Sequence, residues 1–387
     1  MIALGIAGLS LAIWLHLVLF HGRFWWASER DDRRLPPPPA AWPAVVAVVP
    51  ARDEADVVAR SVGSLLAQDY PGAFRVVLVD DGSTDGTAEA ARAAAAEAGR
   101  ADRLEVLRAA PLAAGWTGKL AAVAQGVARA RQGDDPKYLM LTDADIGHAP
   151  DALRKLVVRA EAKGLALASI MVKLHCSTPA ERFLIPAFVF FFQMLYPFPT
   201  ANDPRRRLAA GAGGCMLANA QALERAGGIA AIRGALIDDC TLAALLKREG
   251  PIWIGLTRTS WSLRPYETVA QVGRMVSRSA YAQLKYSPAL LVGTVLGMLL
   301  VYVVPPLFAV LGHGWTRAMG AAAWLLMALS FQPTLRLYRR SPLWGLVLPV
   351  IGAAYCVFTV QSALDHGRGR GGMWKGRAQA QARSQAA

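Results

Sequence analysis

One stretch of this chain, residues 139–145 (Leu-Met-Leu-Thr-Asp-Ala-Asp), restricts its fold more than any other. The apolar run shows no alternation with polar residues, which is typical of a strand buried on both faces of a parallel sheet. It ends in Asp143 and Asp145, and in open α/β sheets ligands bind beyond the carboxyl ends of the strands. Carboxylates bind Mg²⁺ or Mn²⁺ together with substrate phosphates. We therefore expect a divalent metal and a nucleoside diphosphate here; the alternative is that both acids cap the next helix.

The residues around this stretch repeat a strand-turn-helix pattern. Residues 44–49 and 75–79 are short valine-rich runs that end in polar turns, and an amphipathic helix from about residue 54 to residue 67 joins them. Further strands are expected at 104–107 and 165–172, and further helices ending near residues 98, 131, 162 and 247. Such βαβ units predict an α/β fold with a doubly wound, mostly parallel sheet.

The apolar content of the chain indicates that part of it lies in a membrane. Of the 387 residues, 54% are hydrophobic, which is high for a wholly soluble protein. Residues 2–20 are almost entirely apolar and long enough to cross a bilayer. Because the basic residues follow this segment, we expect a retained anchor, with the amino terminus outside and the following segment in the cytoplasm.

Three more apolar segments follow residue 288, at 289–311, 319–335 and 343–364. The first two predict a hairpin, because the basic residues after the second favour the cytoplasmic side. The basic tail also favours the cytoplasm, which conflicts with a fourth full span. Pro349 and Gly352 interrupt the third segment, so both a span and a re-entrant element remain open. The expected domains are an anchor at 1–20, a basic and proline-rich linker at 21–43, a catalytic domain at 44–288, membrane helices at 289–364 and a basic tail at 365–387.

Charge and cysteine content restrict the classes of binding partner and the compartment that are expected for this chain. The net charge of +14 is spread along the chain, and no basic run is interleaved with aromatic residues as in a nucleic-acid-binding module. We therefore expect anionic lipid or phosphate as partner, and no nucleic acid. The cysteines have neither metal-site spacing nor a disulfide pattern, which predicts free thiols in a reducing compartment. They are Cys176, Cys215, Cys240 and Cys356.

Six short motifs occur in one order along the chain. They are Pro-Ala-Arg-Asp-Glu at 50–54, Asp-Asp-Gly-Ser at 80–83, Gly-Lys at 118–119, Asp-Ala-Asp at 143–145, Asp-Asp at 238–239 and Gln-Val-Gly-Arg-Met at 271–275. This order, over roughly residues 44–285, resembles family 2 glycosyltransferases of the GT-A fold. The resemblance implies a Rossmann-like sheet with helices on both faces, a UDP-sugar donor, a divalent metal and inversion of the anomeric centre by direct displacement.

The resemblance also implies a subtype. The flanking membrane segments, the opening at 50–54 and Trp-Lys-Gly-Arg at 374–377 resemble most the hopanoid-associated glycosyltransferases. A multi-pass protein of the bacterial inner membrane is then expected, with its catalytic domain in the cytoplasm and a lipid acceptor in the phospholipid bilayer.

Each motif receives a role from the resemblance. Asp145 would bind the metal that neutralises the departing nucleoside diphosphate. Asp239 would take the proton of the acceptor hydroxyl, since a positioned weak base suffices when the proton leaves as the bond forms. Asp53 stands where the family often has asparagine. The residues expected to bind the donor are Pro50, Arg52, Glu54, Asp81, Lys119, Asp143 and Arg274; those expected beside the transferred sugar or acceptor are Gly213, Gly214, Asp238 and Gln271.

Several of these assignments have a plainer alternative. Lys119 can be a solvated lysine in the first turn of a helix, the glycines at 213 and 214 a tightly packed turn, and Asp238 a helix cap. Residues 183–198 are rich in phenylalanine and contain Pro186 and Pro197. They predict either an in-plane helix at the headgroups, beside the entrance for a lipid acceptor, or a core helix.

The sequence thus predicts a membrane-anchored enzyme that moves one sugar from a UDP-sugar to a lipid hydroxyl, such as that of a hopanoid. Met275 replaces the tryptophan that is prominent in processive synthases of the family, which favours a single transfer. The alternatives are transfer to polyprenyl phosphate, repeated transfer in a polysaccharide synthase, and a membrane scaffold without activity. Retention of Asp81, Asp145 and Asp239 favours an enzyme.

Overall fold

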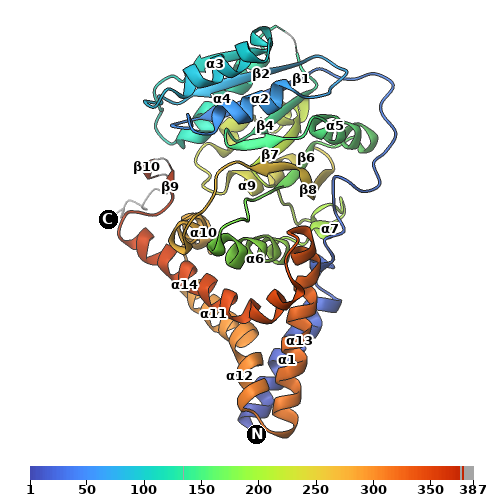
Figure 1. The fold of residues 1–387 in the computed structure, drawn as a ribbon, viewed down its shortest axis with the longest axis vertical. Helices are drawn as coiled ribbons and strands as arrows, with labels where there is room; N and C mark the ends of the chain where they lie inside the picture. Colours follow the sequence, from blue (N-terminus) through green and yellow to red (C-terminus); the bar gives the residue numbers. More distant parts are fainter. Residues whose placement is uncertain (134, 375–376, 379–387) are drawn as a thin grey trace. The chain divides into compact units, whose positions relative to one another are not determined.

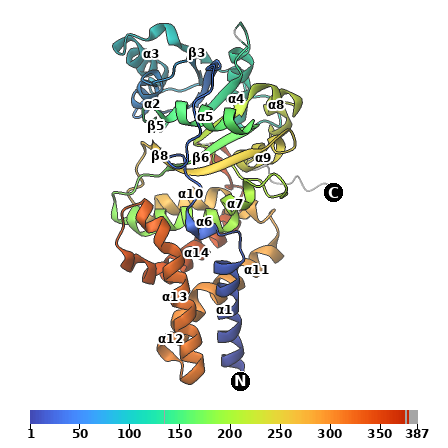
Figure 2. The ribbon, with the colours of Figure 1, turned by 90° about the vertical axis from the view of Figure 1, so that its right-hand side faces the viewer.

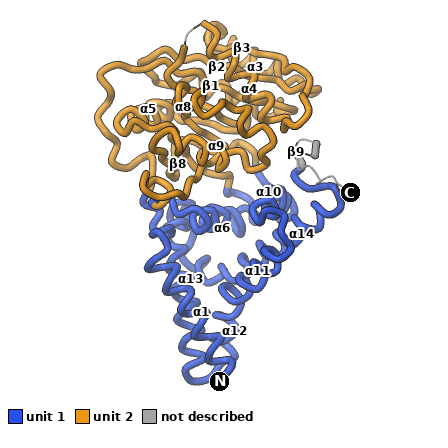
Figure 3. The backbone as a smooth tube through the Cα atoms, turned by 180° about the vertical axis from the view of Figure 1, so that it is seen from behind, with its two compact units in different colours: residues 1–28, 176–199, 265–387 blue, residues 29–175, 200–264 orange. Residues whose placement is uncertain are grey.

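The computed structural model describes residues 1–133, 135–374 and 377–378, and the chain divides into two compact units (Figure 3). The sheet unit comprises Glu29–His175 and Thr200–Arg264. The helical unit comprises Met1–Ser28, Cys176–Pro199 and Pro265–Ala387. Residues 375–376 and 379–387 of the tail predicted at 365–387, including part of the 374–377 motif, lie outside the described residues.

The described part of the sheet unit forms one sheet of eight strands in the order β3-β2-β1-β4-β7-β6-β8-β5 (Figure 1). Strands β3, β2, β1 and β4 are mutually parallel, as are β6 and β8, whereas β7 and β5 run antiparallel to their neighbours. The predicted α/β class is confirmed, with a mixed sheet. The strands are β1 (Val45–Ala51), β2 (Phe74–Asp80), β3 (Leu104–Arg108), β4 (Tyr138–Thr142), β5 (Ile146–His148), β6 (Leu167–Lys173), β7 (Cys215–Asn219) and β8 (Ile252–Ser262).

Strand β1 shows why its sequence lacks alternation: both of its faces are buried. Val45, Ala47 and Val49 pack in a core with α2 (Val58–Leu66), α3 (Thr87–Glu97) and α5 (Ala152–Lys163). Val46 and Val48 pack in a second core with α4 (Gly118–Ala130), α8 (Ala220–Arg225) and α9 (Asp238–Leu246). Successive side chains of a strand point to opposite faces, so helices cover both faces of this sheet.

Two local expectations were wrong. The helix after β1 begins at Val58, not near residue 54. Pro50 and Ala51 extend the strand, and the amides of the next residues donate to side chains of the 83–87 turn; the amide of Glu54 reaches Thr87 Oγ1 at 2.8 Å. Strands β5, β7 and β8 were not expected; β5 is only three residues long and pairs with the end of β8.

Part of the predicted linker packs against the sheet unit. The amide of Asp31 donates to the carbonyl of Leu256 in β8, and the amide of Leu256 donates to the carbonyl of Glu29. The carboxylate of Asp31 accepts hydrogen bonds from the hydroxyls of Thr257 and Thr259. The chain after residue 28 is therefore fixed to an inner strand of the sheet.

The helical unit contains four helices, among the described residues, that are long and apolar enough to cross a membrane (Figures 1 and 2). They are Ile2–Leu19, Pro288–Leu311, Gly314–Leu337 and Pro342–Gly367. The second and third begin earlier than predicted, because Pro288 and Gly314 are already helical. The unit also contains α6 (Pro179–Leu195) and α10 (Val269–Gln283).

Helix α1 (Ile2–Leu19) packs beside α13 (Gly314–Leu337) and α12 (Val304–Leu311). Its two inward polar groups reach a π-helical turn at Leu299–Val303: Ser10 Oγ donates to the carbonyl of Leu300 and Trp14 Nε1 to that of Val301, both at 2.8 Å. Such turns leave carbonyls without their usual partner, and an apolar solvent cannot supply one. These bonds satisfy the carbonyls within the unit.

The aromatic helix α6 is partly a core helix. Phe190 is fully buried, with its ring centroid 5.3 Å from that of Phe24 and 5.1 Å from that of Phe331. Leu195, at the end of the helix, is 58% exposed. For Phe190, burial therefore supports the core alternative, whereas Phe183 and Phe188 are half-buried and the end of the helix is exposed.

We predict opposite effects for two helical glycines of the sheet unit. A Cβ on Gly126 in α4 would lie 2.4 Å from Val48 Cγ1, whereas one on Gly63 in α2 meets nothing within 4 Å. Gly126→Ala should lower the free energy of unfolding by about 1 to 3 kcal/mol through overpacking. Gly63→Ala should raise it by up to about 1 kcal/mol through helix propensity. Thermal unfolding of both variants in the same detergent tests this. Equal changes in unfolding temperature would contradict the packing of α4 on β1.

Candidate active site

The candidate site lies where the parallel strands β1, β2 and β4 end at one edge of the sheet. Glu54 follows β1, Asp81 follows β2, and Asp143 and Asp145 follow β4. The backbone fixes this edge: the amide of Asp81 donates to the carbonyl of Ala51 at 2.8 Å, and that of Asp143 to the carbonyl of Gly214 at 3.3 Å. Parallel pairing therefore gathers acids that lie far apart in the sequence.

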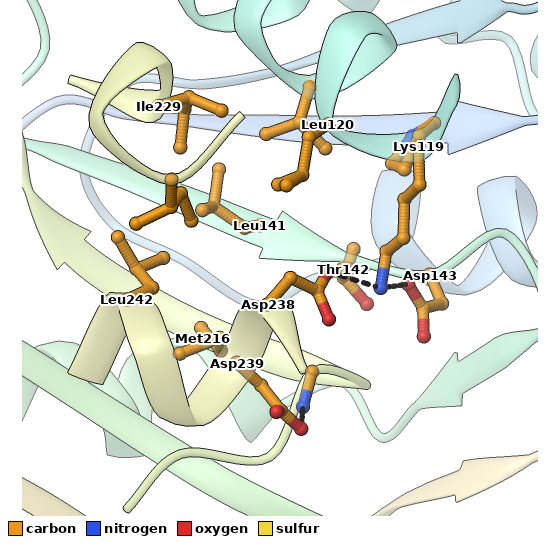
Figure 4. Close-up of a pocket in the computed structure, with 14 residues that line it drawn as sticks. Lys119, Leu120, Leu141, Thr142, Asp143, Met216, Ile229, Asp238, Asp239 and Leu242 are labelled. Carbon is orange, nitrogen blue, oxygen red and sulfur yellow. Dashed lines mark hydrogen bonds and ion pairs between the residues drawn. The ribbon is translucent and has the colours of Figure 1, made fainter. Parts of the chain in front are cut away.

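Lys119 stands between two of the acids. Thr117 caps α4 by accepting the amide of Leu120, which places Lys119 in the first turn. Its Nζ lies 2.9 Å from Asp143 Oδ1 and 3.2 Å from Asp238 Oδ2 (Figure 4). Burial alone would lower the pKa of Lys119, but the charges of Asp143 and Asp238 outweigh it and raise the pKa. Lys119 is thus a permanent cation that joins the end of β4 to the start of α9.

Two backbone amides hold the carboxylate of Asp239. Its Oδ2 accepts the amide of Gly213 at 3.1 Å and its Oδ1 accepts the amide of Cys240 at 2.7 Å. Burial and the charge of Asp238 raise the pKa of Asp239 to about 6, while these hydrogen bonds and Lys119 oppose the rise. A carboxylate with this pKa is ionised near neutral pH and accepts a proton readily.

In the glycine-rich segment before β7, one glycine allows close packing and its neighbour leaves space at the site. A Cβ on Gly214 would lie 2.8 Å from Val172 Cγ2, so this glycine allows close packing. A Cβ on Gly213 would be 3.5 Å from both Asp239 Cβ and Lys119 Nζ. Gly213 therefore keeps the space beside the acids free of a side chain.

Asp145 is paired with an arginine that the sequence motifs did not include. Arg264, two residues after β8, has its Nε 3.8 Å from Asp145 Oδ2 and its Nη2 3.2 Å from Asp56 Oδ1, and it forms an ion pair with Glu54. Burial and the charges of Asp143 and Glu54 raise the pKa of Asp145 to about 6, and Arg264 opposes the rise. A need for positive charge beside clustered acids was the only sequence signal that pointed to such a residue.

Arg52 joins the first two strand ends. Its Nη1 lies 3.5 Å from the carboxylate of Asp81 and donates to the carbonyl of Asp81. Of the buried side-chain polar atoms in the described residues, only Arg52 Nε and Asp31 Oδ1 have no hydrogen-bond partner. Asp53 has a φ of +50° and accepts the amide of Thr84 at 3.0 Å, so it shapes the turn.

A pocket opens beside the acids, with charged groups at one end and an apolar floor (Figure 4). Strand β4, the start of α4, the segment before α9 and α9 itself supply its walls. Its lining residues are Pro50, Lys119, Leu120, Val123, Leu141, Thr142, Asp143, Gly213, Met216, Ile229, Ile232, Asp238, Asp239 and Leu242.

The acids after β4 suit a hard divalent cation that shares its ligands with a substrate. No group of three or more His, Cys, Asp or Glu side chains in the described chain could hold a metal alone. Mg²⁺ and ions like it are commonly held by one or two carboxylates plus water and phosphate oxygens. Burial and the neighbouring charges of Asp143 and Glu54 raise the pKa of Asp145, so a cation bound beside it would favour its ionised form. Asp145, with Asp143 beside it, therefore fits Mg²⁺ or Mn²⁺ arriving with a phosphate ligand.

Two residues expected at the site, Gln271 and Arg274, lie in α10 of the helical unit. Gln271 Oε1 accepts the amides of Glu267 and Thr268, and Thr268 Oγ1 accepts the amide of Gln271, which forms a capping box. Arg274 is exposed on the same helix. The other expected residues all belong to the sheet unit.

The charge at Asp145 predicts a pH dependence of stability. An acid whose pKa rises from 3.8 to about 6 on folding destabilises the fold increasingly as pH rises from about 4 to 6. Asp145→Asn removes this cost, so its unfolding temperature relative to the wild type should be higher at pH 7.5 than at pH 4.5. Thermal unfolding at both pH values tests this. Taking the difference in unfolding temperature between the two proteins cancels the contribution of the other titrating groups. If the difference in unfolding temperature between variant and wild type is the same at both pH values, the charge of Arg264 fully compensates that of Asp145.

Comparisons with known proteins give a family-model match over part of the chain and a fold. Residues 46–227 match the model of the family described as Glycosyl transferase family 2. A similar solved structure is the mannosyltransferase PcManGT from Pyrobaculum calidifontis in complex with GDP-Man and Mn²⁺, with a TM-score of 0.56 and 18% identity over 94% of this chain and 99% of that chain. At this identity the likeness shows the fold alone, which is a GT-A-like α/β sheet.

Two further structures share less of the geometry. Mannosyl-3-phosphoglycerate synthase from Rubrobacter xylanophilus has a TM-score of 0.42 and 18% identity, over 69% of this chain and 82% of that chain. TarS residues 1–349 from S. aureus, in complex with UDP-GlcNAc, has a TM-score of 0.40 and 12% identity, over 84% and 92%. No curated protein matches this chain in sequence.

Proposed function

We propose, on the premise that residues 46–227 belong to glycosyl transferase family 2, that this chain moves a single sugar from a UDP-sugar to the hydroxyl of a membrane lipid. The observation that carries the proposal is the gathering of Asp143, Asp238 and Asp239 around Lys119, with Asp145 beside Arg264, at one edge of the sheet. A transferase that expels a nucleoside diphosphate needs both positive charge for the leaving group and a base for the acceptor, and this edge supplies both.

The strand ends provide the donor site. The turns after β1 and β2, with Glu54, Arg52 and Asp81, bind the nucleoside, and the buried Nε of Arg52, which lies 3.9 Å from Asp53 Oδ2, makes no hydrogen bond. Asp145, with Asp143, holds Mg²⁺ or Mn²⁺, which supplies positive charge to the diphosphate as it leaves. The ammonium of Lys119 lies beside the same acids and faces the donor's phosphates or sugar.

Asp239 provides the acceptor side of the reaction. The acceptor oxygen forms a bond to the anomeric carbon, the bond from that carbon to the diphosphate oxygen breaks with its electron pair, and the acceptor proton passes to Asp239. This single displacement inverts the anomeric centre. The two amides that bind Asp239 fix its direction, and Gly213 leaves room for the substrate beside it.

A lipid acceptor is supported by the four apolar helices in the described part of the chain that meet the length for spanning a bilayer. The basic residues after α1 support a catalytic domain on the cytoplasmic side of the inner membrane of a bacterium. Within the subtype that the sequence resembles, the lipid is a hopanoid. Arg274 on α10 provides a further guanidinium for the diphosphate, since its planar fork matches phosphate oxygens.

We predict that Asp239→Asn lowers turnover by about 10² or more, the usual scale for loss of a general base, while binding of UDP with Mn²⁺ stays nearly unchanged. Turnover is measured with radiolabelled UDP-sugar and lipid extract, and binding by calorimetry. Asp102→Asn, at an exposed acid of the same unit, is the matched control and should change neither. Near-normal turnover in Asp239→Asn would show that another group takes the proton.

A further inference from the structure

Arg264 is held beside the acids by the backbone, not only by its own charge. The amide of Leu263 donates to the carbonyl of Asp145 at 2.8 Å, and β5 pairs antiparallel with the end of β8, Ile146 opposite Ser262. The end of β8 is thereby fixed against the turn that carries Asp145. An arginine at position 264 must therefore project near this turn.

The guanidinium of Arg264 faces three carboxylates. It pairs with Glu54, lies 3.2 Å from Asp56, and has its Nε 3.8 Å from Asp145 Oδ2. Lys119, the other cation of the site, is engaged with Asp143 and Asp238. The two acids of the Asp-Ala-Asp turn thus have separate partners, and that of Asp145 is Arg264.

The position of Arg264 affects the binding of a divalent cation at Asp145. A divalent ion bound to Asp145 and a guanidinium within 4 Å of the same carboxylate repel each other. A guanidinium also matches two oxygens of a phosphate better than any other side chain does. The side chain of Arg264 is 31% exposed, so an incoming ligand can reach it.

We propose that Arg264 exchanges partners during donor binding: it neutralises Asp145 and Glu54 before the donor arrives, and its guanidinium then binds the diphosphate while the metal takes its place at Asp145. The inference rests on the proposed function, because it needs a nucleoside diphosphate and a divalent metal at this edge. Arg264 weakens binding of the metal alone and strengthens binding of the metal with the nucleotide. Metal and donor therefore enter together.

The test is the pair of affinities in Arg264→Gln. Binding of Mn²⁺ alone, followed by the EPR signal of the free ion, should become tighter by about threefold or more, because a repelling charge is removed. Binding of UDP at saturating Mn²⁺, measured by calorimetry with GDP as a second probe, should become weaker by about tenfold, the effect of losing a charge-assisted hydrogen bond. Neither readout depends on turnover.

Two further variants separate charge from shape. Arg264→Lys keeps the charge but not the fork, so Mn²⁺ alone should bind as weakly as in the wild type, with UDP binding between those of the wild type and Arg264→Gln. Arg258→Gln changes an exposed arginine of the same strand and should leave both affinities unchanged. If Arg264→Gln does not fold, Arg264→Lys still tests the proposal. UDP binding by Arg264→Lys equal to that of the wild type would overturn it.

Three outcomes contradict the exchange. Both affinities moving in the same direction in Arg264→Gln, or neither moving while the wild type binds UDP with Mn²⁺, would overturn this inference alone. A wild-type protein that binds neither UDP nor GDP in the presence of Mn²⁺ would overturn the proposed function and this inference together.

Discussion

Negative charge gathered at the carboxyl ends of parallel strands is the constraint on which the site depends. The pKa of Asp145 and that of Asp239 both rise to about 6, because burial and neighbouring acids disfavour their ionised forms. Lys119 and Arg264 supply the opposing charge. Carboxylates that are only partly balanced by fixed cations favour a further cation, which fits a site for a metal and a diphosphate.

The sheet topology explains how this charge is gathered. The parallel order β2-β1-β4 brings three strand ends to one edge, and the antiparallel β7, beside β4, delivers the glycine segment whose Gly213 amide binds Asp239. Apolar residues on both faces of β1 and β4 keep these strands rigid, so the polar turns beyond them hold fixed positions. The stability of the core thereby offsets the cost of holding like charges together.

The sequence revealed the acidic edge but not its arginine. Asp143 and Asp145 could be recognised because a non-alternating apolar run precedes them, and such a run forms a buried strand in few other ways. Arg264 could not, since its position depends on the three-residue β5, too short to predict from hydrophobic pattern. The aromatic composition of α6 fits both a membrane interface and a core, and only the burial of Phe190 among Phe24 and Phe331 distinguishes them.

Transfer of sugar from a nucleotide to a membrane lipid can be measured in a single reconstituted system. The full-length protein is reconstituted in liposomes that contain bacterial lipid extract, and radiolabelled UDP-sugars are added with and without Mn²⁺. Label should enter the organic phase only with metal, as a lipid carrying one sugar whose anomeric configuration is opposite to that of the donor. Label that stays in the aqueous phase with every donor, or lipid products of increasing chain length, would contradict transfer of a single sugar to a lipid.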